Sequence, residues 1–436
     1  MTKNILMLVM IAGLLTKAWA QDTLQISLET LQAKVQERNL QARIAEKQLE
    51  SASADFRQSN ALFLPSISAS HTAIVTTNPL MAFGSKLNQE VLTPADFDPN
   101  LLNNPGKTEN YATQIEVLQP LINLDGIYQR QAARSKMEAY GLQAERTKEY
   151  LELEVSKAYM QLQLAYKAVE VMQQANTTAQ ANLKLVNDFY DQGMLQKTDL
   201  LDVQVRVGEV SNHLQAARSN VQNASDYLAF LMNEPTNVQV YIPAEPLSGE
   251  VEMAVFDISL SENRKDIQAI NKSSEAYEKM LQSGKMTFLP RLNAFGNYQM
   301  YDDKLFGTRA KGYLVGAQLS WTLFDGYKSI GKLQKNKVEY QKAEAEADQY
   351  KSKSQMELNA AYRQLKDAQN KSNNAGLALE QSKEAYKIRK DRFEEGLVKT
   401  SDLLMSETQM YQKELEYLQT VFEYNFTKNY LEFLTK

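Results

Sequence analysis

Apolar residues recur every seven positions along two long stretches of this chain, neither of which contains a proline. The two rows are Val155, Leu162, Val169, Asn176, Leu183 and Tyr190, and Leu358, Leu365, Ser372, Leu379, Tyr386 and Phe393, and each contains one polar residue, Asn176 or Ser372. The companion positions are mostly alanine, which lets neighbouring helices approach closely. The pattern predicts long helices at 126–192 and 326–395 that pack as coiled coils. At a rise of about 1.5 Å per residue, each would be about 100 Å long.

The stretch that ends each long helix is itself repeated. Asp188 to Leu201 (DFYDQGMLQKTDLL) aligns without a gap with Asp391 to Leu404 (DRFEEGLVKTSDLL), at an offset of 203 residues (391 − 188). In each copy a glycine precedes an Asp-Leu-Leu sequence, which is how one helix stops and the next begins. The sequence therefore predicts two helical hairpins, with return helices at 198–232 and 401–434.

A different period precedes each long helix. Phe63-Leu64-Pro65 and Phe288-Leu289-Pro290 end a first helix in each copy, expected at 27–60 and 261–283. After each proline, apolar and polar residues alternate, which predicts strands. The strands are expected at 65–77 and 109–124, and at 290–303 and 310–324. The second strand of each pair runs into an Asp-Gly pair that marks a strand-to-helix junction: Asp125 and Gly126, and Asp325 and Gly326.

The chain is therefore predicted to contain one structural unit twice. The expected segments are a first repeat at 21–232, a linker at 233–260 and a second repeat at 261–436. The first repeat has the longer loop between its strands, at about 78–108. The linker contains three prolines and one short alternating run, and we expect it to form a small mixed belt against the helices.

The first twenty residues have the pattern of a signal peptide. Lys3 precedes an apolar run from Ile5 to Leu15, and Ala18-Trp19-Ala20 is a cleavage site of the small-x-small type. The alternative is a membrane anchor, but eleven apolar residues (5–15) are too few to span a bilayer. The sequence contains no cysteine, so we expect an exported protein without disulfides that is not a lipoprotein.

Composition excludes several classes of function. A mean hydropathy of −0.46 with 23% charged residues argues against a helical membrane bundle, and the net charge of −5 gives no reason to expect nucleic-acid binding. The two histidines, His71 and His213, are far apart, and no nucleophile motif or phosphate loop is present. We expect no catalytic residue, cofactor or metal, and conclude that the protein is not an enzyme.

The strands suit a transmembrane barrel, with one apolar face toward lipid and one polar face toward water. A half-buried soluble sheet produces the same alternation, and the strands alone leave both possibilities open. Export and the adjoining long helices favour the barrel. Four strands cannot close a membrane barrel, since the smallest have about eight, so the chain is predicted to oligomerise. We expect an α+β membrane protein with an internal two-fold repeat, its coiled-coil hairpins continuous with a transmembrane β-barrel.

Across essentially the whole mature chain, these features resemble the outer membrane efflux proteins, the TolC-like outer-membrane factors. The most specific are the two Phe-Leu-Pro helix ends, the two Asp-Gly junctions and the paired hairpin tips. The resemblance implies a homotrimer with about twelve strands in one barrel, in the outer membrane of a Gram-negative bacterium. It implies a passive exit duct of a tripartite efflux pump or type I secretion system, with a periplasmic adaptor and an inner-membrane transporter of RND or ABC type. A structural or adhesive exported coiled-coil protein is the alternative.

The resemblance also places a periplasmic gate at the hairpin tips. Aligned on the glycines, Asp199 and Asp402 match the tip aspartates of the family, and Asp202 is a further candidate. Where the family has a tyrosine–arginine latch, this chain has Phe393 and Val398. The resemblance places adaptor contact on the tip residues Gly193, Met194, Gly396, Leu397, Val398 and Lys399. Helix N-capping is the alternative role for the aspartates.

Overall fold

The structure is a computed structural model that describes residues 22–249 and 258–436. The expected signal peptide and residues 250–257 of the expected linker lie outside the described residues. Internal contacts divide the chain into two compact units, and both sequence repeats contribute to each unit. We name them the helical unit (the described residues of 1–46, 143–265 and 350–436) and the strand unit (47–142 and 266–349). No helix in the described ranges has the length and apolar character needed to cross a membrane.

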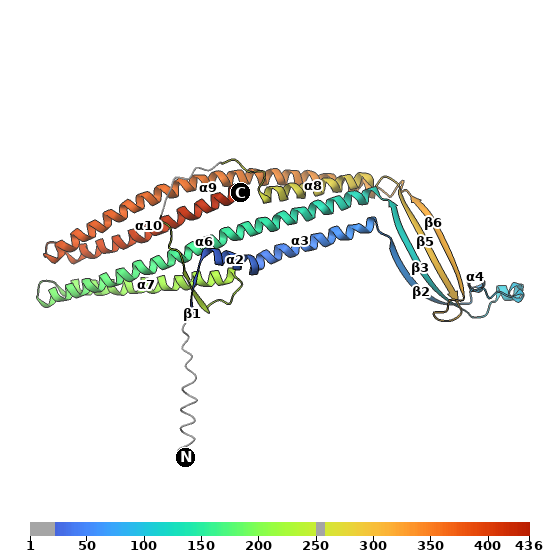
Figure 1. Cartoon of the computed structure of the whole chain (residues 1–436), viewed down its shortest axis with the longest axis horizontal. Helices are drawn as coiled ribbons and strands as arrows, with labels where there is room; N and C mark the ends of the chain where they lie inside the picture. Colours follow the sequence, from blue (N-terminus) through green and yellow to red (C-terminus); the bar gives the residue numbers. More distant parts are fainter. Residues whose placement is uncertain (1–21, 250–257) are drawn as a thin grey trace, which may run out of the picture. The chain divides into compact units, whose positions relative to one another are not determined.

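The described residues contain the two predicted helical hairpins. The first consists of α6 (Leu124–Asp191) and α7 (Lys197–Leu231), and the second of α9 (Lys328–Glu394) and α10 (Thr400–Thr435) (Figure 1). The second heptad row is buried along its whole length, from Leu358 (0% exposed) to Phe393, whereas in the first row Val155 and Leu162 are buried and the residues from Val169 to Tyr190 are half-buried. The companion alanines Ala158 and Ala361 are buried as well. Burial therefore confirms the coiled-coil packing that the heptad repeat predicts.

The single helix predicted at 27–60 is wrong, because the structure has two helices there, α2 (Leu28–Arg38) and α3 (Leu40–Gln58). Asn39 lies between them with extended backbone. Its amide nitrogen donates to the carbonyl of Leu231 at 2.8 Å, and its side-chain oxygen accepts from the N–H of Gln41 at 2.8 Å. One asparagine thus caps α3 and fastens the break to the end of α7. The matching helix of the second repeat is α8 (Lys265–Met286).

The linker contributes one strand to a small sheet. β4 (Gln239–Pro243) pairs in parallel with β1 (Asp22–Ile26), a strand that the sequence analysis did not predict. The hydroxyl of Tyr159 on α6 lies 3.2 Å from the carbonyl oxygen of Ile26 and within hydrogen-bond distance of the carboxylate of Glu245, and its one proton can be donated to either oxygen. These bonds hold the sheet and the chain after β4 against α6.

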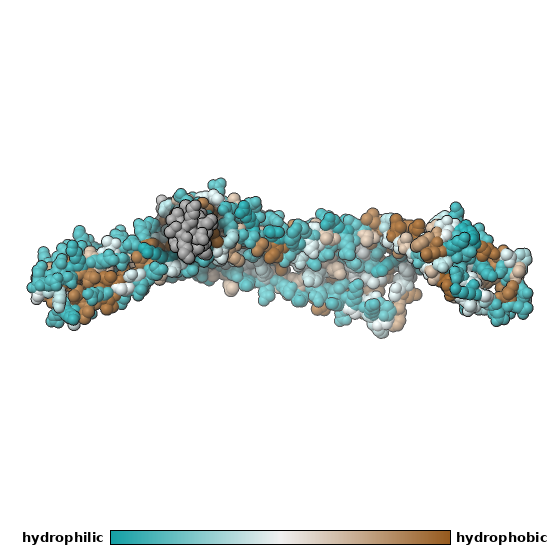
Figure 2. All heavy atoms as spheres, turned by 90° about the horizontal axis from the view of Figure 1, so that it is seen from below, coloured by the Kyte–Doolittle hydropathy of each residue, from teal (hydrophilic) through white to brown (hydrophobic). Residues whose placement is uncertain are grey.

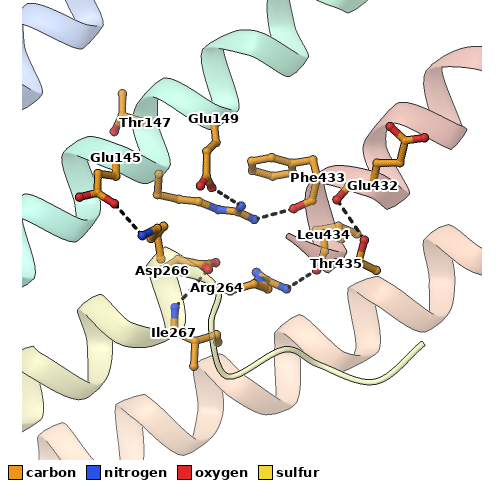
Figure 3. Close-up of polar contacts among 12 residues, drawn as sticks. Glu145, Thr147, Glu149, Arg264, Asp266, Ile267, Glu432, Phe433, Leu434 and Thr435 are labelled. Carbon is orange, nitrogen blue, oxygen red and sulfur yellow. Dashed lines mark hydrogen bonds and ion pairs between the residues drawn. The ribbon is translucent and has the colours of Figure 1, made fainter. Parts of the chain in front are cut away.

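Two arginines hold the C-terminal end of α10. Arg264 is buried and donates from Nη1 to the carbonyl of Leu434 at 3.2 Å (Figure 3). Arg146 on α6 donates to the carbonyl of Phe433 at 3.1 Å, and its guanidinium lies 3.6 Å from the centre of that ring. The last carbonyls of a helix lack partners within the helix, and positive charge is favourable there. Both arginines therefore complete the end of α10, and Arg146 also fixes it against α6.

Residues 47–142 and 266–349 contain an antiparallel four-stranded sheet in the order β2-β3-β5-β6. The strands are β2 (Ser66–Thr76), β3 (Thr108–Ile122), β5 (Arg291–Asp302) and β6 (Ala310–Ser320). β6 ends four residues before the boundary expected at 324. Trp321, just beyond it, instead donates from its indole nitrogen to the carbonyl of Phe288 at 2.9 Å. β2 and β6 are the edges of this sheet, and most of their residues are exposed on both faces.

The register gathers apolar residues on one face of the sheet. Ala69, Ile115, Tyr298 and Tyr313 are partners in one row across the four strands. The next row on the opposite face joins Ser70, Gln114, Gln299 and Gly312. Successive residues of a strand point to opposite faces, so the alternation in the sequence becomes one apolar and one largely polar face.

The segment expected as a loop at 78–108 contains helices, so that expectation is corrected. They are α4 (Pro79–Asn88), the 3₁₀ helix η2 (Pro94–Phe97) and α5 (Pro99–Asn103). Asn78 and Asp98 each cap a helix whose first residue is proline, a start signal visible in the sequence. Buried Gln89 donates to the carbonyl of Glu109 at 2.9 Å and to that of Asp302 at 3.2 Å, so the insert is tied to the ends of β3 and β5.

Candidate functional site

The two hairpin tips have the same backbone geometry. Gly193 has a φ of +75° and Gly396 a φ of +73°, a left-handed conformation that glycine adopts without strain. The N–H of Gly193 bonds the carbonyl of Tyr190 at 2.9 Å, and the N–H of Met194 bonds that of Phe189 at 2.9 Å. The second tip repeats both bonds, from Gly396 to Phe393 and from Leu397 to Arg392, each at 2.9 Å. Both long helices therefore end in the same Schellman motif.

The tip aspartates lie inside the first turn of each return helix rather than at the N-cap. Gln196 and Lys399 occupy the N-cap positions of α7 and α10, three residues before Asp199 and Asp402. The carboxylate of Asp199 accepts from the backbone N–H of Gln196 at 3.0 Å, so it completes a capping box. Among the described residues, no hydrogen bond or ion pair reaches the carboxylate of Asp402. The capping role is therefore confirmed for Asp199, which acts from the first turn of α7, and among the described residues Asp402 makes no such contact.

Apolar contacts join the two hairpins just behind the tips. The rings of Phe189 and Phe393 lie 5.8 Å apart between centroids. Phe393, Val203 and Leu403 are buried in one core cluster, and Val398 packs against it. Phe393 and Val398, the two residues that replace the tyrosine–arginine latch of the family, thus make hydrophobic contacts in this chain.

The residues expected to contact an adaptor lie mostly at the surface. Met194 is 61% exposed and Leu397 67% exposed, and the side chain of Lys399 is also exposed. Figure 2 shows apolar residues at the surface near the tips, among hydrophilic ones. Asp202 is exposed, whereas Asp199 and Asp402 are half-buried. The tips therefore present an apolar surface with carboxylates beside it.

The two Asp-Gly junctions differ although their sequences match. Asp125 and Gly126 lie within the first turn of α6, and buried Asp125 receives two bonds from Arg291, at 2.6 and 3.0 Å. Asp325 and Gly326 precede α9, and Gly326 has a φ of +67°. The hydroxyl and N–H of Ser329 both donate to Asp325, and these bonds lower the pKa of its carboxyl. The first junction is thus held by an ion pair. The second is a turn that is held by the bonds from Ser329 and that needs glycine at position 326.

One polar cluster in the helical unit was missed by the sequence analysis. Asn182, Arg206 and Glu407 meet in the interior about two turns from the tips. The signal was present, because the apolar row of the second return helix skips from Leu404 to Tyr411 and Glu407 lies in the gap. The described residues contain no group of three or more side chains suited to hold a metal ion.

The tips, hairpins and sheet match one known family throughout. Residues 30–234 and 259–432 match the family described as outer membrane efflux protein. A membrane protein from Pseudomonas aeruginosa superposes with a TM-score of 0.82 and 18% identity, over 97% of this chain and 95% of that one. The outer membrane protein VceC from Vibrio cholerae gives 0.79 and 16%, over 94% and 96%.

The CmeC outer membrane channel of Campylobacter jejuni has a TM-score of 0.79 at 15% identity, over 94% of this chain and 85% of that chain. No curated protein matches the sequence significantly. At these identities the structural likeness establishes the fold, while the sequence match covers both repeats and well over half of the chain. The chain therefore belongs to the outer membrane efflux protein family.

Proposed function

We propose that this protein is a passive exit duct of a tripartite efflux pump or type I secretion system, spanning the outer membrane and periplasm. The observation that carries the proposal is the sheet of the strand unit, which has one apolar face and two exposed edges, β2 and β6. An open edge in lipid leaves backbone groups without partners. Pairing of β6 in one copy with β2 in the next would satisfy them and place the apolar faces toward lipid.

Oligomerisation follows from the number of strands. A closed membrane barrel needs at least about eight strands, and three copies would supply them. We propose a homotrimer in the outer membrane of a Gram-negative bacterium, reached through the signal peptide predicted at 1–20. An adhesive coiled-coil protein, the alternative, leaves the apolar face and the open edges of the sheet without a role.

The hairpin tips would form the periplasmic mouth of the duct. In a trimer, Asp199 and Asp402 each contribute three carboxylates around one axis, with Asp202 beside them. Like charges at close range attract counter-cations, so the closed mouth should prefer cations. The exposed apolar residues of the tips, Met194 and Leu397, are the surface we assign to a periplasmic adaptor, which would link the duct to an inner-membrane transporter.

Conductance across a planar bilayer tests this function. The purified protein should form channels that favour cations and are blocked by trivalent cations from the side of the tips. Asp402→Ala should weaken that block by at least about tenfold while channels still insert, because three carboxylates leave the mouth. Asp367→Ala, the same change at an exposed position of the same hairpin, should leave selectivity and block unchanged. Absence of channels from well-folded wild-type protein would contradict the proposed function.

A further inference from the structure

A buried polar cluster lies in the helical unit behind the tips. Glu407 on α10 is 0% exposed and Asn182 on α6 is 2% exposed. The side-chain nitrogen of Asn182 donates to Oε2 of Glu407 at 2.5 Å. Nε of Arg206 on α7 lies 3.6 Å from Oε1 of the same carboxylate. One carboxylate from the second hairpin thus inserts between two polar side chains of the first.

The contacts around this carboxylate all run from one hairpin to the other. Asn182 also lies 3.4 Å from the hydroxyl of Tyr386 on α9, and the hydroxyls of Thr178 on α6 and Tyr411 on α10 are 2.8 Å apart. By contrast, the ion pair of Lys383 with Glu414, at 2.9 Å, lies within the second hairpin and is more exposed. The buried network therefore links the two hairpins, whereas the ion pair of Lys383 and Glu414 joins two helices of one hairpin.

The network is expected to add little to the free energy of unfolding, because it buries charged groups. Burial raises the pKa of the Glu407 carboxyl, which means that burying its charge costs free energy, and the charge of Arg206 and the bond from Asn182 oppose this shift only in part. Among the described residues, neither Oε1 of Glu407 nor Nε of Arg206 has a hydrogen-bond partner. Buried ion pairs of this kind commonly add no stability over apolar residues, and their best-attested role is to fix the register between packed helices.

Among the described side chains that face Glu407, Arg206 carries the positive charge that balances the carboxylate. Tyr386 and Tyr411 contribute hydroxyls from α9 and α10, and burial raises the pKa of Tyr386 to about 12, so this hydroxyl stays neutral. Glu209, the other acidic partner of Arg206 at 3.6 Å, lies on the exposed side of α7. Removing Arg206 would therefore leave a carboxylate buried without a positive charge.

We propose that Arg206, Asn182 and Glu407 are positioning residues that hold the second hairpin in register with the first, and so keep the mouth of the duct closed. The role of these residues in closing the mouth rests on the proposed function. Their role in coupling the two hairpins does not. Glu407 lies on α10, seven residues after its first residue, Thr400, whereas Asn182 and Arg206 lie on the first hairpin. Movement of the second hairpin along the first therefore has to separate the carboxylate from both partners. The cluster takes the role of a polar latch in a chain whose tips are joined by Phe393 and Val398.

The test uses a reporter thiol in the full-length protein, which has no cysteine of its own. Ser406, next to Glu407, is buried, and so is Ser354 on α9 far from the cluster. The thiol introduced by Ser406→Cys should react slowly with a maleimide. Adding Arg206→Met should raise its rate by at least about tenfold, because an unpaired buried carboxylate forces the packing apart. Ser354→Cys should remain slow, since the rest of the helical unit stays folded.

Three further variants complete the test. Arg206→Lys, which keeps the charge, should restore slow labelling, and so should Glu407→Gln added to Arg206→Met. Lys383→Met, the matched loss of a cation from the ion pair within the second hairpin, should change the rate by less than about twofold. Slow labelling at Ser406→Cys in the Arg206→Met variant, or equal acceleration at both reporters, would overturn the proposal.

Recording the Arg206→Met variant in planar bilayers distinguishes two claims: that the cluster couples the hairpins, and that this coupling keeps the mouth of the duct closed. If the wild type conducts, the variant should open spontaneously at least about tenfold more often. Unchanged opening would overturn the assignment to the mouth. If the wild type never conducts, the proposed function fails, and the thiol labelling still decides whether the cluster couples the hairpins.

Discussion

Replacing Leu358 by alanine is expected to lower the free energy of unfolding of the helical unit by about 2–5 kcal/mol. Leu358 is 0% exposed and packs with Ala361, Leu365 and Tyr424 in the core between α9 and α10. Removing its branched end takes apolar contacts away and leaves a cavity, because the packed side chains around it relax only partly into the space. Thermal unfolding followed by circular dichroism of the helices measures the change.

The matched control is Leu377→Ala on the same helix. Leu377 is 56% exposed, so the same truncation should change the free energy of unfolding by no more than about 0.5 kcal/mol. Equal losses in the two variants would mean that the heptad row does not define the core of the hairpin.

Replacing Gly396 by valine is expected to weaken binding of the adaptor by at least about tenfold. Gly396 has a φ of +73°, and a β-branched residue in this conformation is strained by about 1–3 kcal/mol. No atom lies within 4 Å of the position where a Cβ would sit, so the strain arises from the backbone rather than from a clash. The turn should rearrange and displace Leu397 and Val398, while the core behind it stays packed. Affinity for the cognate adaptor, measured on detergent-purified protein, tests this.

Gly208→Val provides the control for the tip variant. Gly208 lies within α7, no atom lies within 4 Å of the position where its Cβ would sit, and its φ is not positive, so valine there adds the same side chain without comparable strain. Wild-type adaptor affinity in the Gly396→Val variant, or equal loss in both variants, would contradict docking through the tip.

The hairpins were predictable because their determinants are local in sequence. A heptad row directly encodes which side of a helix is buried, and the row ending at Phe393 is buried as that rule requires. The tip glycine encodes the left-handed residue that closes a Schellman motif. The boundaries of α7 and α10 fall within one residue of those expected, 198–232 and 401–434. For such elements, the local pattern and the tertiary structure impose the same requirement.

The features that were missed depend on partners distant in sequence. Asn39 breaks the first helix because the carbonyl of Leu231 accepts its amide hydrogen, and nothing local to Asn39 reveals that partner. β1 is a strand only because β4 lies beside it. Glu407 is buried against Asn182, 225 residues away in the sequence, and the gap in the apolar row at Glu407 does not reveal that partner. The two Asp-Gly junctions likewise differ through Arg291, which reaches Asp125 from β5, the strand next to β3.

The number of chains in one complex tests the central claim most directly, since a sheet with two open edges needs other copies to close it in lipid. Native mass spectrometry of the protein, extracted from the outer membrane in a mild detergent, measures that number. The account predicts a complex with the mass of three mature chains, whose strands are protected from protease. A single folded chain, with β2 and β6 accessible to protease, would contradict it.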